Sequence, residues 1–197
     1  IYATATKPQN VSGKLSQNNE SLHMNSELNT IVELEEKKEF DLAFKSYENL
    51  YSTNSDDFEV WKHFYFFLWI IIEDMPNEFI EKINREKRLQ KMFLEGKVNF
   101  NDNPEFNFIV GYTMSIFPYE FGNHEVYEKL SKELITNAIN IDSENPIYKM
   151  AYFGDLLDTP LEYEELKLKS LPIVLKKYNG IGLLNKYFRQ VLNRVKK

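Results

Sequence analysis

The segment Phe64–Ile72 constrains the fold most, because its nine consecutive residues are all apolar. It lies within FEVWKHFYFFLWIIIED, residues 58–74, which also holds two tryptophans eight positions apart, Trp61 and Trp69. A helix that is apolar all round has to be covered on most sides by other elements. A bilayer span needs about 20 apolar residues, and charged residues flank this shorter run, so the sequence predicts a buried helix and no membrane span.

The composition favours one soluble all-α domain. The chain has 197 residues, 43% of them hydrophobic and 15% aromatic, which is enough for a sizeable core. Seven glycines and seven prolines are too few turn residues for a barrel or sandwich. The formal net charge of −6 favours a basic partner over nucleic acid or an anionic membrane. The absence of cysteine excludes disulfides, thiolate zinc sites and cysteine nucleophiles, and fits the cytoplasm.

The first 23 residues are polar and lack a sustained period, so we expect residues 1–23 to be a tail or linker and 24–197 to form a single helical domain. Two interpretations of the start stay open. Ala3-Thr4-Ala5 resembles the small residues before a signal-peptidase site, which would make the protein periplasmic instead of cytoplasmic. Alternatively, Met24 is the native start.

Apolar spacings of three and four predict helices separated by turns. Ser26 is the expected cap of the first helix, and Gly96 the expected end of the fourth. Gly111 should permit a close helix approach, Asp158 or Thr159 should cap the eighth helix, and Pro172 should interrupt it. The expected helices are 26–37, 41–52, 58–73, 77–95, 104–116, 124–140, 145–157, 160–178 and 182–195.

Two stretches resemble tetratricopeptide repeats. In residues 38–61, Ala43 and Tyr47 match the small and aromatic positions of the repeat, and residues 127–148 resemble the end of one repeat and the start of the next. The resemblance implies stacked antiparallel helix hairpins. Lys38 replaces a usual glycine, Ser55 and Ser143 replace usual prolines, and residues 75–123 do not fit the repeat length. We therefore expect an irregular helical insertion, residues 76–116, that covers the helix at 58–74.

The sequence predicts no catalytic residues, no metal site and no cofactor, because it contains no phosphate-binding loop, GxSxG or HExxH motif. Two carboxylate–imidazole pairs, Glu59 with His63 and His124 with Glu128, share helix faces. Brought together, the four could bind a metal ion. Surface contacts are the more ordinary outcome for pairs with this spacing.

The turn at 117–123 is the predicted partner-binding site, because it is unusually rich in rings. Tyr119 and Phe121 flank Glu120, a composition typical of binding hot spots, and Glu125 follows closely. The alternative is that both rings turn inward and fill the space between two hairpins.

Together these features predict a non-catalytic protein–protein interaction module. Within that class we favour an immunity or antitoxin-like protein that binds and blocks a bacterial toxin, because an acidic inhibitor would be steered to a basic toxin. The alternatives are a helical metal-dependent enzyme using the two Glu/His pairs, and a periplasmic scaffold protein.

Overall fold

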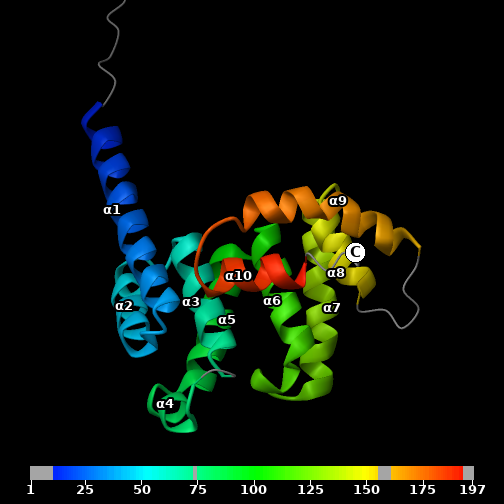
Figure 1. The fold of residues 1–197 in the computed structure, drawn as a ribbon, viewed down its shortest axis with the longest axis horizontal. Helices are drawn as coiled ribbons and strands as arrows, with labels where there is room; N and C mark the ends of the chain where they lie inside the picture. The colour runs from blue at the N-terminus through cyan, green and yellow to red at the C-terminus, as the bar shows by residue number, and fades with distance from the viewer. Residues whose placement is uncertain (1–10, 73–74, 155–160, 193–197) are drawn as a thin grey trace, which may run out of the picture.

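The computed structural model describes residues 11–72, 75–154 and 161–192, with side chains from residue 24 onward. Within these ranges the protein is all-α, with ten α-helices, one short 3-10 helix and no strand (Figure 1). The elements are α1 Val11–Glu36, α2 Phe40–Thr53, α3 Phe58–Ile70, α4 Asn77–Lys82, α5 Arg85–Phe100, α6 Pro104–Ile116, η1 Pro118–Glu120, α7 His124–Ile141, α8 Pro146–Gly154, α9 Glu162–Lys177 and α10 Leu183–Val191.

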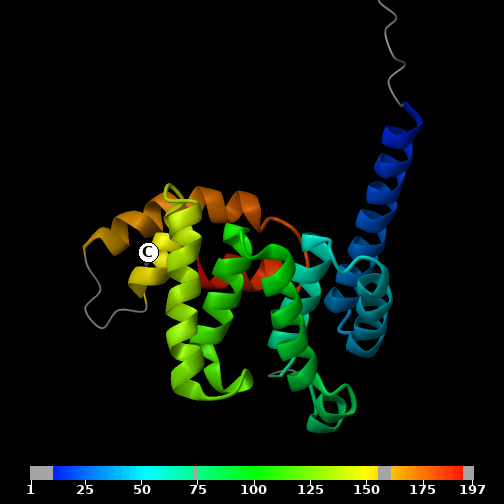
Figure 2. The same ribbon diagram turned by 180° about the vertical axis from the view of Figure 1, so that it is seen from behind.

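Helices that are neighbours in sequence pack against each other at both ends of the molecule. α1, α2 and α3 form one end, and α6, α7 and α8 form the other (Figures 1 and 2). α9 lies along one edge, next to α8, and α10 passes through the middle, where it contacts α1, α3 and α9. This arrangement confirms the predicted all-α class and is compatible with a helical-repeat protein.

α3 is the central helix, as its apolar run predicts. Its side chains from Val60 to Trp69 are all buried. On one side the Trp61 indole donates a 2.9 Å hydrogen bond to the Met92 carbonyl of α5. From α6, the ring centroid of Phe106 lies 5.0 Å from that of Trp61. α5 and α6, both within residues 76–116, thus cover part of α3 as expected, and that this segment is an insertion in a repeat array stays a prediction.

α10 provides further cover for α3, which the sequence did not indicate. The Phe188 ring of α10 is fully buried and its centroid lies 5.3 Å from that of Phe66 in α3. Phe188 also contacts the rings of Phe108, Tyr112 and Tyr178, at 5.1 to 5.5 Å. The last described helix is thus a central part of the core.

The helix predicted at 77–95 is in fact two helices, and Gly96 does not end the second. The break comes at Asn84, which adopts a left-handed backbone with φ 52°, a conformation that Asn tolerates better than most residues. α5 then runs through Gly96 to Phe100. A Cβ at position 96 would lie 2.6 Å from the rings of Trp61 and Phe106, so glycine is needed there for close packing.

α1 begins at Val11, so the predicted start near Ser26 is wrong. Ser26 lies inside the helix, where its carbonyl accepts a hydrogen bond from the Thr30 hydroxyl. Once packing of the buried Leu28 and Ile31 has nucleated the helix, each added residue gains a backbone hydrogen bond at little further cost. The N-terminal half of α1 projects away from the other helices (Figures 1 and 2).

The remaining expectations have mixed outcomes. Gly111 does allow close packing of α6 on α7, since a Cβ there would lie 2.9 Å from the Ser131 carbonyl oxygen. Pro172 is accommodated inside α9, which continues from Glu162 to Lys177, so the predicted interruption is wrong. The proposed caps Asp158 and Thr159 lie outside the described residues.

Candidate functional site

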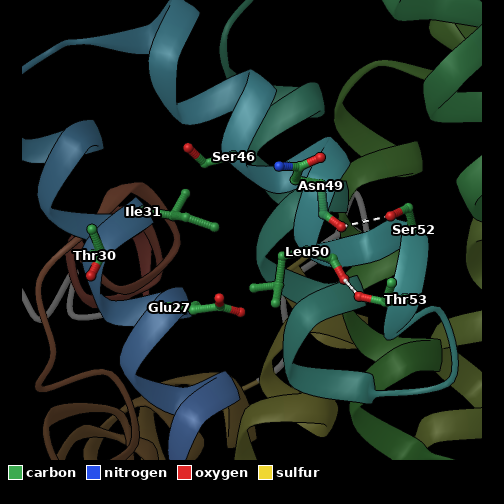
Figure 3. A pocket seen from close by; sticks show the side chains of 8 residues that line it. All are labelled: Glu27, Thr30, Ile31, Ser46, Asn49, Leu50, Ser52 and Thr53. Carbon is green, nitrogen blue, oxygen red and sulfur yellow. Dashed lines mark hydrogen bonds between the residues drawn. The ribbon is translucent and has the colours of Figure 1, made fainter.

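An open depression of about 480 Å³ lies between α1 and α2 (Figure 3). Ile31 from α1 and Leu50 from α2 project into it and form an apolar floor, and both are almost fully buried. The Glu27 carboxylate points across from α1 toward α2. The rest of the lining consists of hydroxyl and amide side chains, Thr30, Ser46, Asn49, Ser52 and Thr53.

Two of these hydroxyls are already engaged by the backbone of α2. Ser52 donates to the Asn49 carbonyl at 2.7 Å, and Thr53 donates to the Leu50 carbonyl at 3.3 Å (Figure 3). An apolar floor with a carboxylate and polar groups at its rim suits a lysine or arginine side chain, whose aliphatic part packs on the floor while its charge meets the carboxylate. We call this depression the α1–α2 groove.

The acidic excess of the chain falls in the segment that forms the α1–α2 groove, although Glu27 is the one acidic side chain among the described residues that line the groove itself. Residues 24–57, which contain the described side chains of α1, all of α2 and the next turn, include nine Asp or Glu and three Lys or Arg. Their net charge of −6 equals that of the whole chain. The rest of the chain is balanced, with 21 acidic and 21 basic residues. Three of these carboxylates already pair with cations of other helices, Glu36 with Lys186, Asp41 with Lys82 and Glu48 with Arg88.

Two adjacent carboxylates hold the end of α1 against the start of α10. Glu35 accepts hydrogen bonds from the Tyr47 hydroxyl at 2.7 Å and from the Leu183 N–H at 2.8 Å. Glu36 accepts from the Gly182 N–H at 2.8 Å and from the Lys186 ammonium at 2.5 Å. Negative charge is favourable at a helix N-terminus, so these contacts stabilise α10 and fix the position of α1.

The surroundings shift the pKa values of these two carboxyl groups in opposite directions. Burial raises the pKa of Glu35 to about 7, and its hydrogen bonds to Leu183 and Tyr47 only partly offset that effect. The hydrogen bond from Lys186 lowers the pKa of Glu36, and the hydrogen bond from Gly182 acts in the same direction. The contact between α1 and α10 is therefore sensitive to pH.

Two of the four side chains predicted to bind a partner at or beside the turn 117–123 are buried, and partner binding there stays a prediction. Tyr119 is 56% exposed, but Glu120 and Phe121 are only 8% and 3% exposed. Glu120 forms a buried ion pair with Arg85, which also donates to the Leu68 carbonyl at 3.2 Å. The Phe121 ring turns inward between Phe93 and Tyr127.

Two of the four side chains predicted to bind a partner lie on the surface near this turn. Tyr119 and Glu125 are exposed, while the neighbouring Phe121 contributes to the core. A run of rings alone does not show which of them face solvent: of residues 118–121, which form and follow the 3-10 turn, only Tyr119 is exposed.

Glu59 and His63 lie in a polar pocket of about 210 Å³ between α3, α6 and the end of α9. Lys62 bridges Glu59 at 2.7 Å and Glu105 at 3.4 Å, and Lys177 approaches Glu105 at 3.1 Å. Burial and the adjacent Lys62 lower the pKa of His63 to about 3, so the imidazole is neutral. The positive and negative charges in this pocket balance.

The second Glu/His pair is on the exposed surface of α7, where His124 Nδ1 lies 3.8 Å from Glu128 Oε2. Among the residues that the structure describes, no three His, Cys, Asp or Glu side chains are grouped closely enough to hold a metal ion. The four-residue metal site considered from the sequence is therefore not assembled.

Sequence reasoning missed the α1–α2 groove, because the depression depends on how the two helices are spaced. One signal was available, namely the excess of acidic residues in 24–57. No helix in the described ranges is long and apolar enough to cross a bilayer. Comparison with protein-family models, curated proteins and solved structures gave no match.

Proposed function

We propose that this protein is a non-catalytic, protein-binding module that uses the α1–α2 groove to bind a basic polypeptide segment. The observation that carries the proposal is the Glu27 carboxylate at the rim of an apolar-floored groove, in a segment, residues 24–57, whose formal net charge is −6. An acidic patch attracts basic partners over a distance and accelerates their association. The apolar floor then adds short-range affinity.

The narrower proposal is that the partner is a bacterial toxin and that this protein is its immunity or antitoxin-like inhibitor. The support is the acidic face together with a helical architecture compatible with stacked, tetratricopeptide-like hairpins. Solenoids of helix pairs commonly serve as binding scaffolds. Inhibition requires that bound toxin loses its activity at one inhibitor per toxin, so a partner that stays active when saturated refutes the narrower proposal.

The groove can be tested directly with a fluorescein-labelled arginine-rich peptide and fluorescence anisotropy. Asn49→Trp fills the groove without changing its charge, and we expect it to weaken binding at least about tenfold. Asn137→Trp, the same change on the exposed face of α7, is the matched control and should bind as the wild type does.

The charge contribution needs a separate pair of variants. Glu27→Gln should weaken peptide binding, whereas Glu133→Gln on α7 should leave it unchanged although it removes the same charge. Equal binding of a glutamate-rich peptide, or undiminished binding by Asn49→Trp, would contradict the assignment of the groove.

A further inference from the structure

α9 has two faces of different character. Ser170 and Val174 on its inner side are fully buried. On the opposite side, Leu168 is 61% exposed and Leu175 is 43% exposed, and Leu161, just before the helix, is 91% exposed. The inner face holds α9 on the body of the protein, while the outer face leaves three leucines in water.

The exposed leucines are seven residues apart, so they recur every two helical turns on one side of α9. Pro172 is exposed and lies on the same side, four residues after Leu168. We call these four residues the α9 stripe. In both views α9 lies along the outer edge of the molecule, with no other helix beyond it (Figures 1 and 2). A linear apolar surface of this kind fits another helix.

The charges beside the α9 stripe are divided along the helix. Glu162, Glu164 and Glu165 occupy the first turn, and Lys176 and Lys177 occupy the last. Two lysines lie between these turns, and each pairs with a glutamate of the same helix, Lys167 with Glu164 at 3.1 Å and Lys169 with Glu165 at 3.6 Å. The first turn of α9 is thus acidic and its last turn is basic.

We propose that the α9 stripe binds a second copy of this chain, with the two α9 helices antiparallel about a twofold axis at Leu168. In that arrangement Leu161 lies opposite Leu175 of the second copy, so all three leucines become buried. A twofold interface uses the same patch on both copies, and the stripe is self-complementary in this way.

Charge selects the antiparallel orientation. With Leu168 at the axis, Glu165 faces Lys169 of the second copy, and Glu162 faces Lys176 of the second copy. The two residues of each pair lie at nearly the same height along the helix axes. A parallel pair would bring the two acidic first turns to the same end of the interface, which is repulsive. Antiparallel helix dipoles also favour the first arrangement. Because only one helix from each copy supplies the contact, the dimer should dissociate on dilution.

The oligomeric state provides the first test, by light scattering or sedimentation over a concentration series. We expect the wild-type mass to rise from 23.4 kDa toward twice that value as concentration increases. Leu168→Glu should remain monomeric at every concentration, because it replaces the central apolar contact with two carboxylates at the axis, next to the two Glu165 side chains. Leu94→Glu on α5 is the matched control, since Leu94 is also 61% exposed, and it should dimerise normally. Circular dichroism checks that both variants stay folded.

The orientation of the two helices is tested by oxidative cross-linking. The chain has no native cysteine, so only introduced cysteines can form a disulfide. In the antiparallel dimer the two Leu161 positions are 14 residues apart along the axis, or about 21 Å, whereas disulfide formation needs Cα atoms within about 7 Å. Leu161→Cys alone should therefore give no cross-linked dimer, and an equal mixture with Leu175→Cys should give one. A wild-type mass fixed at 23.4 kDa, a dimer lost in Leu94→Glu but kept in Leu168→Glu, or cross-linking of Leu161→Cys with itself would overturn the proposal.

Discussion

The buried carboxylate of Glu35 accepts a 2.7 Å hydrogen bond from the hydroxyl of Tyr47, twelve residues away on the next helix. Tyr47 is fully buried and its ring stacks on Phe64 of the central helix α3, with centroids 5.2 Å apart. Glu35 in turn accepts from the Leu183 N–H of α10. One ionisable side chain thus joins α1 and α2 to the helix that closes the core.

Replacing Glu35 should change how stability depends on pH. Its pKa is raised to about 7 in the folded protein from 4.5, so the folded state holds this proton more tightly. The stabilisation is fully present below pH 4.5 and is lost as the pH rises through 7. Glu35→Gln cannot ionise and therefore does not lose this stabilisation. The free energy of unfolding of the variant, relative to that of the wild type, should increase by up to about 3 kcal/mol between pH 4.5 and 8. Urea unfolding at several pH values measures the difference.

Glu36→Gln is the control for that experiment, because the folded protein shifts the pKa of Glu36 in the opposite direction from that of Glu35. The pKa of Glu36 is lowered in the folded protein, so its ionised form contributes stability above its unfolded pKa and loses it as the pH falls. Glu36→Gln should therefore be less stable than the wild type at pH 7, with a difference that shrinks at pH 4. If both variants showed the same pH trend, the assignment of Glu35 would be wrong.

The turn at 117–123 should respond very differently at adjacent positions. Glu120→Ala leaves Arg85 buried without its ion-pair partner, and we expect a loss of about 3 kcal/mol in the free energy of unfolding. Tyr119→Ala removes a side chain that is 56% exposed and should cost less than about 1 kcal/mol. Thermal unfolding distinguishes the two, and a similar loss at both positions would contradict the buried ion pair.

Gly96→Ala tests the close contact between α5 and α3. The added Cβ would lie 2.6 Å from the rings of Trp61 and Phe106, so we expect overpacking to cost about 1–3 kcal/mol. This loss should outweigh the gain of roughly 1 kcal/mol in helix propensity. Denaturant unfolding followed by tryptophan fluorescence reports on the contact. Lys97→Ala, the exposed next residue, serves as the reference and should be near neutral.

Lys38→Gly should stabilise the α1–α2 turn. Lys38 has φ 58°, a left-handed conformation that costs most side chains about 1–2 kcal/mol and glycine almost nothing. After the greater chain entropy of unfolded glycine is subtracted, we expect a net gain of about 0.5–1 kcal/mol. Lys45→Gly, in the exposed interior of α2, should instead lose about 1 kcal/mol. A loss at both positions would show that Lys38 makes a contact worth more than its backbone strain.

Lys38 also bears on the resemblance to tetratricopeptide repeats. The pattern places a glycine at the first hairpin, where this chain has Lys38, and the backbone there does adopt the conformation that glycine favours. Lysine rarely adopts this conformation, so the residue itself did not predict it, and membership of the repeat family stays a prediction. The long start of α1 was not, because helix extension past Ser26 depends on nucleation by packing further along the chain.

The sequence by itself determined that this protein is helical and that α3 is its buried centre, because periodicity and an unbroken apolar run are local properties. Only the tertiary structure decided that Glu120 and Phe121 turn inward, that Glu59 and His63 do not meet His124, and that the α1–α2 groove exists. These depend on which side chains from distant segments meet, and a linear pattern does not contain the distances between helices. The acidity of residues 24–57 is readable from the sequence, but only the packing of α1 on α2 places Glu27 at the rim of a groove.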